Sequence, residues 1–245
     1  MNFKFLPNVL TLLNLFLGCV VVVNLVLESF DIEYIFIITV ICLILDYFDG
    51  FIARKLNAKS ELGLQLDSLA DIISFGLVPG IIIFNLLNKV NSSSFGSIHE
   101  SVGSINKMII PFTAFIITLC SAYRLARFNI RKSSADYFLG LATPLNAVLV
   151  YSISIISSKD TFYHQFISSY EFLIAFTILS SIILVSNLKL INFKFTNFKF
   201  KGNRARIFLI FSSLPLLFFL KINAVPIIFL IYILTSVLKF YVFKD

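Results

Sequence analysis

Apolar blocks, separated by short polar connections, run through most of this chain. A block of about 20 residues spans a bilayer as a helix, at about 1.5 Å of rise per residue. Lipid-exposed backbone must satisfy all its hydrogen bonds internally, which continuous apolar helices do. We therefore expect an all-α integral membrane protein with about eight transmembrane helices. Their expected ranges are 8–27, 34–56, 63–88, 107–130, 138–157, 171–188, 206–220 and 225–243.

The composition excludes an ordinary soluble domain. The chain is 58% apolar and 13% charged, whereas soluble domains are about 45–50% apolar and about 25% charged. The three cysteines lie in different apolar blocks, a spacing that favours neither a disulfide framework nor a zinc site. The first block has no A-x-A-like cleavage site after it, which favours a retained helix over a signal peptide.

The positive charge is arranged by side of the membrane. Sixteen of the 20 lysines and arginines fall on one side of the expected helices, and Lys89, Lys107, Lys159 and Lys221 fall on the other. Cytoplasmic loops are enriched in Lys and Arg, so the bias predicts an even number of spans with both termini in the cytoplasm. It also accounts for the net charge of +7 without a nucleic-acid partner. We expect a prokaryotic cytoplasmic (inner) membrane.

A basic connection from Lys189 to Arg206 divides the chain. It is typical of a charged cytoplasmic loop, and an interfacial segment is the alternative. We expect a core of about six transmembrane helices in residues 1–190 and a pair of helices in 191–245. Pro215 is expected to break the first helix of that pair, because proline removes a backbone hydrogen bond.

Four aspartates in the second and third blocks are the strongest indication of function. Each carboxylate within a membrane helix costs about 2.5–3.5 kcal/mol, so such residues are usually functional. Asp46 and Asp49 precede a short polar turn at 57–60, and Asp67 and Asp71 follow it at matching distances. At about 3.6 residues per turn each pair shares a helix face. Asp49 and Asp67 are therefore expected at one depth and Asp46 and Asp71 at another, with all four converging in one pocket near the cytoplasmic side.

Carboxylates gathered in this way repel one another unless cations lie between them. Hard divalent ions prefer oxygen ligands, and two such ions assist displacement at phosphorus. We expect Mg²⁺ or Mn²⁺, bound as a pair of ions. Small residues on the same helix faces, Gly50, Ala53 and Gly63, leave room for a phosphate-bearing ligand or allow close helix packing.

The pattern D-x-x-D-G-x-x-A-R, followed by G-x-x-x-D-x-x-x-D, resembles the signature of the CDP-alcohol phosphatidyltransferase family. Every fixed position is present, and the similarity extends from Pro7 to about Asn146. The matching residues are Asp46, Asp49, Gly50, Ala53, Arg54, Gly63, Asp67 and Asp71.

The resemblance implies a role for each of these positions. Asp46, Asp49 and Asp67 would bind metal, and Asp71 would be the general base for the acceptor hydroxyl, with metal contact as a second role. The residues expected to line the CDP site are Gly50, Ala53, Arg54 and Gly63. The acceptor oxygen would attack the phosphate of CDP-diacylglycerol that carries the diacylglycerol, and CMP would leave.

The first block resembles the family's P-N-x-x-T-x-x-N start. Asn8, Thr11 and Asn14 share one helix face. They are expected either to contact the nucleotide or to form hydrogen bonds between helices.

Three stretches resemble members of the family that use serine as the acceptor, namely residues 66–76, 121–129 and 140–144. Ser68 and Ile72 replace residues of the D-P-x-A-D-K pattern, which is typical of the relatives that use glycerol 3-phosphate or make cardiolipin. We therefore expect CDP-diacylglycerol and L-serine as substrates. Glycerol 3-phosphate and inositol are the alternative acceptors.

Three arginines, Arg124, Arg127 and Arg131, lie on one face of the fourth block, near its cytoplasmic end. A guanidinium binds a carboxylate well, so we expect at least one of them to contact serine or phosphate. Arginines at a cytoplasmic helix end are also expected from topology alone.

A divalent-cation transporter is the alternative from another functional class, because intramembrane carboxylates also mark ion pathways. A pathway needs carboxylates along several spans, whereas these four gather in one helical hairpin. Membrane lipids are expected partners, and the family resemblance adds a homodimer.

Overall fold

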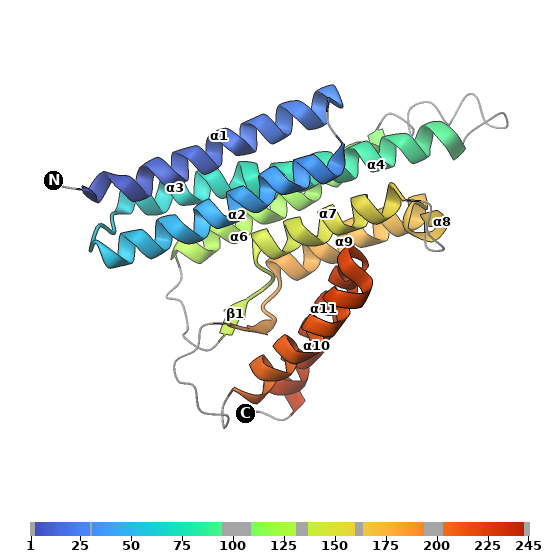
Figure 1. Ribbon diagram of the computed structural model, residues 1–245. Helices are drawn as coiled ribbons and strands as arrows, with labels where there is room; N and C mark the ends of the chain where they lie inside the picture. The colour runs from blue at the N-terminus through green and yellow to red at the C-terminus, as the bar shows by residue number, and fades with distance from the viewer. Residues whose placement is uncertain are drawn as a thin grey trace.

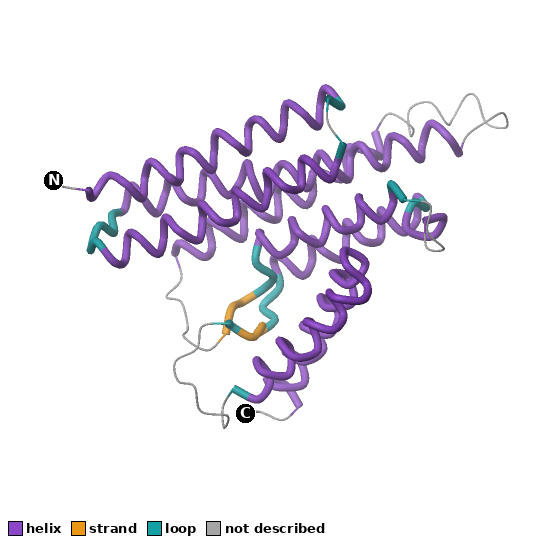
Figure 2. Tube along the Cα trace, viewed as in Figure 1, coloured by secondary structure: helices purple, strands orange, loops and turns teal. Residues whose placement is uncertain are grey.

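The computed structural model describes residues 3–29, 31–94, 109–130, 137–159, 164–193 and 203–242. Nearly all of them are helical (Figures 1 and 2). The α-helices are α1 (Leu6–Leu27), α2 (Ile32–Lys55), α3 (Glu61–Asp71), α4 (Val78–Ser94), α6 (Ile116–Ile130), α7 (Thr143–Ser157), α8 (His164–Ile167), α9 (Tyr170–Val185), α10 (Arg204–Leu220) and α11 (Ala224–Val237). Short 3₁₀ segments cover Phe3–Phe5, Ile110–Phe115 and Lys221–Asn223, and π-helical segments cover Ile72–Leu77 and Leu238–Val242.

The long helices from α1 to α9 run along one another, and α10 and α11 form a hairpin set at an angle to them (Figure 1). Four stretches of the described chain are long and apolar enough to cross a membrane: Leu6–Leu27, Ile32–Lys55, Glu61–Val90 and Arg204–Val242. The last of these contains both arms of the α10–α11 hairpin. Thr143–Ser157 and Tyr170–Val185 are shorter apolar helices. The expectation of an all-α fold is confirmed, and these four stretches fit membrane-spanning segments in length and composition.

The expected helix 138–157 starts later than the apolar pattern suggests. Residues Tyr137–Leu139 form strand β1, which pairs antiparallel with β2 (Lys189–Ile191), drawn in orange in Figure 2. Gly140 follows β1 with a φ of 71°, a left-handed conformation that ends the strand and suits glycine. Helix α7 then begins at Thr143, with proline in its first turn, where its missing N–H costs nothing.

Two other expectations about helix boundaries are corrected. Helix α10 continues through Pro215 rather than breaking there. Helix α4 extends to Ser94, so the polar connection after it begins later than expected. The basic connection between α9 and α10 contains β2, and its residues 194–202 lie outside the described part of the chain.

Strand β2 attaches the C-terminal hairpin to the rest of the bundle. The Tyr232 hydroxyl of α11 donates to the Ile191 carbonyl at 3.0 Å, and the Ile191 N–H donates to Ser236 Oγ at 3.2 Å. Arg206, only 3% exposed, donates from Nε to the Asn192 carbonyl at 2.6 Å. Strand β2 pairs with the three residues of β1 along one edge. The bonds from the hairpin satisfy further backbone groups of Ile191 and Asn192.

Close helix packing brings α6 against the chain that follows α3. The Thr118 hydroxyl donates to the Gly76 carbonyl at 3.0 Å. A Cβ atom at Gly76 would lie 3.2 Å from Ser121 Cβ, tighter than ordinary contact. The π-helical turn Ile72–Leu77 and its glycine therefore set how near α6 comes to the end of α3. Segments of this kind often occur at functional sites.

We predict that Gly140→Ala destabilises the protein. Its Cβ would lie 2.5 Å from the Leu184 carbonyl oxygen and 3.0 Å from that of Ser186, and the φ of 71° is itself strained for alanine. Such strain costs about 1–3 kcal/mol, or roughly 2–12 °C of melting temperature for a chain of this size. Thermal unfolding in detergent measures the change.

Gly50→Ala is the matched control for stability. It lies within helix α2, and its Cβ would meet only the end of the Arg54 side chain, at 3.4 Å. Because alanine favours helix over glycine, its melting temperature should stay the same or rise. A Gly140→Ala protein as stable as the wild type would contradict this account of the turn.

Candidate active site

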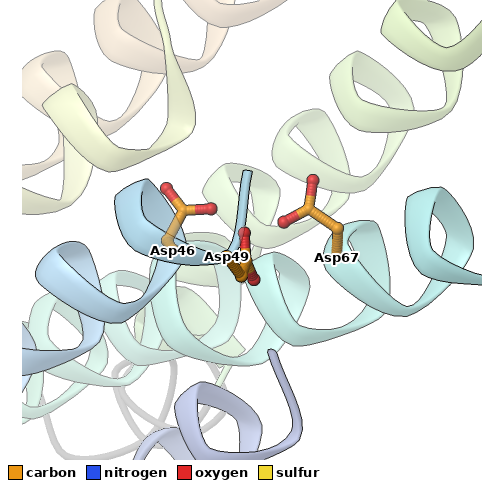
Figure 3. A group of neighbouring side chains, drawn as sticks. All are labelled: Asp46, Asp49 and Asp67. Atoms are coloured by element: carbon orange, nitrogen blue, oxygen red, sulfur yellow. The ribbon is translucent and has the colours of Figure 1, made fainter. Parts of the chain in front are cut away.

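Three carboxylates from two adjacent helices form an acidic cluster (Figure 3). Asp46 and Asp49 lie on α2 and Asp67 lies on α3, and one oxygen of each is within 4.8 Å of the others. Asp49 is buried, and Asp46 and Asp67 are half-buried. Figure 3 shows Asp46 and Asp67 turned toward the space between the two helices. Oxygen ligands of one divalent ion lie within about twice a metal–oxygen distance of 2.0–2.6 Å, so this spacing suits such an ion.

The turn between α2 and α3 determines this convergence. Helix α2 ends at Lys55, and Asn57 takes a left-handed conformation with a φ of 49°. Ser60 then caps α3 by accepting a hydrogen bond from the Gly63 N–H at 3.0 Å. The short turn makes the helices antiparallel, so equal distances from it lie at equal depth. The structure thus brings Asp46, Asp49 and Asp67 together as their spacing predicts.

Helix α1 closes one side of the cluster. The Thr11 hydroxyl, which is buried, donates to Asp49 Oδ2 at 2.5 Å and also lies 3.0 Å from the Pro7 carbonyl. The Asn8 side chain lies beside Gly63, where an added Cβ would be 3.1 Å from its Oδ1. Interhelical hydrogen bonding, one of two roles expected for this face, is therefore present at Thr11. Nucleotide contact by Asn8 and Thr11 stays a prediction.

Asp71 lies one turn beyond Asp67 on α3 and is 8% exposed. Its Oδ1 atom is buried and has no hydrogen-bond partner within the described chain. Its carboxyl is close enough to the three cluster aspartates and to Arg124 to interact electrostatically with them. A buried carboxylate oxygen without a partner is costly unless a ligand or cation meets it. Asp71 is thus positioned beside the cluster with one oxygen available.

The structure describes two of the three arginines of the fourth block, and these two make different contacts. Arg124 is near Asp71, and its Nε is buried without a hydrogen-bond partner among the described residues. Arg127 donates to the Val185 carbonyl at 2.8 Å and to the Asn187 side chain, which satisfies the C-terminal end of α9. Arg131 lies outside the described residues. Of the arginines in this block that the structure describes, Arg124 is the one near an aspartate of the site.

The residues expected to line the CDP site surround the end of the α2–α3 hairpin. Gly50 and Ala53 are half-buried, and Arg54 is exposed. The Arg54 guanidinium lies over Gly50, within 3.4 Å of where a Cβ would be, and interacts electrostatically with Asp49. A positive charge is thus held at the edge of the acidic cluster, where an anionic phosphate would approach.

The far end of the bundle contains a separate cavity of about 1150 Å³, lined in part by Asn24, Glu33 and Lys159. None of the expected site residues lines it. Glu33 and Lys159 form an exposed ion pair of 2.7 Å there. The candidate site is therefore assigned from the carboxylates and not from the size of a cavity.

Residues 4–182 match the family model described as CDP-alcohol phosphatidyltransferase. The chain belongs to this family. The match covers most of the chain, from the start of α1 into α9, and includes the complete acidic motif. The resemblance drawn from the motif is therefore confirmed.

Similar proteins from bacteria and an archaeon carry the name CDP-diacylglycerol–serine O-phosphatidyltransferase. The chain is 31% identical to one from Helicobacter pylori over 95% of this chain and 90% of the relative. It is 28% identical to one from Bacillus subtilis, over 62% of this chain and 76% of the relative. It is also 28% identical to one from Methanocaldococcus jannaschii, over 75% and 72% respectively.

We predict that Thr11→Val weakens divalent-metal binding at the acidic cluster of this family member. The change removes the hydroxyl that orients Asp49 and keeps the side-chain shape. Groups that orient metal ligands typically contribute 10- to 100-fold in affinity, so the Kd for Mn²⁺ should rise about tenfold or more. Titration of free Mn²⁺ by electron paramagnetic resonance measures it without any need for turnover.

Thr113→Val is the control, because that hydroxyl donates only to a nearby backbone carbonyl in the Ile110–Phe115 segment. Its Mn²⁺ affinity should equal that of the wild type. An unchanged Kd in a folded Thr11→Val protein would show that Thr11 does not support the metal site.

Proposed function

We propose that this protein transfers the phosphatidyl group of CDP-diacylglycerol to the hydroxyl of L-serine, forming phosphatidylserine and releasing CMP. The observation that carries the proposal is the acidic cluster of Asp46, Asp49 and Asp67, with Asp71 one turn deeper, in a chain of this family. The serine acceptor is supported by the names of the similar proteins and by Arg124, which suits a carboxylate beside Asp71.

The donor set supports a divalent cation, Mg²⁺ or Mn²⁺, as the cofactor. Asp46, Asp49 and Asp67 would hold one ion through oxygens that already lie within 4.8 Å of one another. The available Oδ1 atom of Asp71 supports a second ion, and we propose two. When bound, the ions would supply positive charge against the diphosphate and the departing CMP.

The side chains of this protein would then perform the following steps. Asp71 accepts the proton of the serine hydroxyl, and the serine oxygen forms a bond to the phosphorus that carries the diacylglycerol. The bond from that phosphorus to the oxygen of the CMP phosphate breaks, and CMP leaves with the electron pair. Arg54, at the edge of the cluster, holds the nucleotide phosphates, while Gly50, Ala53, Gly63 and Asn8 shape the space around them.

We also propose that the acidic cluster and both termini face the cytoplasm, with the helices crossing the membrane about eight times. The N-terminus and the α2–α3 turn lie toward the same end of the bundle in Figure 1. Most of the lysines and arginines belong to connections on that side. CMP and free serine are water-soluble, which agrees with a cytoplasmic site. A homodimer completes the proposal and rests on the family resemblance.

The proposal is tested by CMP release from the purified protein in detergent with Mn²⁺ and CDP-diacylglycerol. We expect release to depend on L-serine and to stop with EDTA. Asp71→Asn removes the base and should lower the rate by about 10²–10⁴-fold. Asp31→Asn is the matched control, because Asp31 lies before α2 at the other end of the bundle and its side chain caps nothing.

The outcomes separate the alternatives. Release with glycerol 3-phosphate or inositol, and not with serine, would retain the family activity and refute the acceptor. Equal rates of CMP release from the Asp71→Asn and Asp31→Asn proteins would refute the role of Asp71 as the base. No release with any of these alcohols from the folded, Mn²⁺-loaded protein would refute the transferase proposal.

A further inference from the structure

A group of fully buried polar side chains lies on helices α6 and α7. Thr143, Asn146 and Ser121 are each 0% exposed. The hydroxyl oxygens of Thr143 and Ser121, and both polar atoms of the Asn146 amide, have no hydrogen-bond partner within the described chain. Roughly 90% or more of buried polar groups in proteins have a partner. Four unsatisfied atoms on neighbouring helices therefore require a ligand or bound water.

Helix geometry indicates how far along the bundle Thr143 lies. Three buried side chains from α2, the π-helical segment and α7 pack together, namely Cys42, Phe75 and Ala147. Four residues, about one turn, separate each of them from Asp46, Asp71 and Thr143 respectively. Helix α2 runs toward the α2–α3 turn, whereas α3 and α7 run away from it (Figure 1). Going from the packed residue to its partner four positions away therefore leads toward that turn on all three helices. Thr143 thus lies at the level of Asp46 and Asp71.

Helix α6 supplies the other wall. A Cβ added at Gly76 would lie 3.2 Å from Ser121 Cβ and 4.0 Å from the Asp71 carbonyl oxygen. Ser121 is therefore near the backbone of Asp71. Arg124 is one turn along the same face of α6 and interacts electrostatically with Asp71. Helix α7, which carries Asn146, packs against α2, α6 and the π-helical segment.

We propose that Thr143, Asn146 and Ser121 form, with Arg124, the pocket that recognises the α-amino and α-carboxylate groups of the acceptor. This inference rests on the function proposed above and identifies the residues that select an amino acid. Nothing in the motif assigns a role to Thr143, Asn146 or Ser121, because the fixed motif positions lie on α2 and α3.

The unpartnered atoms match the polar groups of a free amino acid. Arg124 Nε, the Asn146 amide nitrogen and the Ser121 hydroxyl are donors for a carboxylate. The Asn146 amide oxygen and the Thr143 hydroxyl oxygen are acceptors for an ammonium group. The Asp71 carboxylate, the proposed base, is the acceptor for the side-chain hydroxyl. Glycerol 3-phosphate and inositol lack the ammonium group, so they leave those acceptors unpaired.

The test compares L-serine with 3-hydroxypropionate, which has the same hydroxyl and carboxylate and no amino group. CMP release is measured against each acceptor at saturating CDP-diacylglycerol and Mn²⁺. Asn146→Leu and Thr143→Val keep the side-chain volume and remove the acceptors. We expect the KM for serine to rise about tenfold or more, with the KM for CDP-diacylglycerol unchanged. The preference for serine over 3-hydroxypropionate should fall by a similar factor.

Thr177→Val and Asn85→Leu are the matched controls, because their side chains already donate to backbone carbonyls, at 2.7 and 3.0 Å, away from the acidic cluster. Both should keep the serine preference of the wild type. A purely structural defect lowers activity with both acceptors alike and leaves the preference unchanged. Thr143→Val replaces one hydroxyl by a methyl group and provides the test if Asn146→Leu does not fold.

If the wild-type protein uses serine and both variants keep its KM for serine and its serine preference, the inferred acceptor pocket is refuted and the proposed function stands. That result would assign the buried atoms to bound water. Wild-type protein without serine-dependent CMP release would refute the proposed function itself, and the amino-acid pocket with it.

Discussion

The placement of carboxylates inside apolar helices is the constraint on which the rest of this structure depends. Asp49 is buried and Asp71 is 8% exposed, each at the cost of leaving water. The protein offsets part of that cost with the Thr11 hydroxyl on Asp49 and the nearby Arg124 guanidinium beside Asp71. The divalent cations proposed above would offset the remaining charge. The short α2–α3 turn, the packing of α1 and the approach of α6 all serve to hold this group together.

The apolar blocks and the aspartate spacing made much of this predictable from sequence. Block length locates the helices, and equal distances from one turn predict that Asp46, Asp49 and Asp67 meet. Both inferences work because they use local geometry along one helix or across one tight turn. The signal for β1 was weaker, since three residues between a glycine and a basic stretch carry no periodicity. Gly140, with its φ of 71°, marks the break only once the backbone is seen.

Contacts between distant helices could not be predicted in this way. Transmembrane helices are apolar on all sides, so periodicity does not show which face meets which neighbour. Arg127 and Arg124 share a helix face in sequence, yet one satisfies the end of α9 and the other lies beside Asp71. Likewise, periodicity does not separate Ser121, Thr143 and Asn146 from ordinary helix-packing residues, and their lack of partners is seen only in the structure.

The proposed site would combine two kinds of polar environment, and this division has a physical basis. Carboxylates at the α2–α3 hairpin suit the cations and the diphosphate, whose charges are common to all CDP-alcohol substrates. An acceptor alcohol differs from its competitors in neutral and singly charged groups, which fixed hydrogen-bond partners distinguish best. A buried group left unpaired by the wrong acceptor imposes a large penalty. Unpaired buried atoms on α6 and α7 are therefore the expected form of a pocket that selects its acceptor, as proposed above.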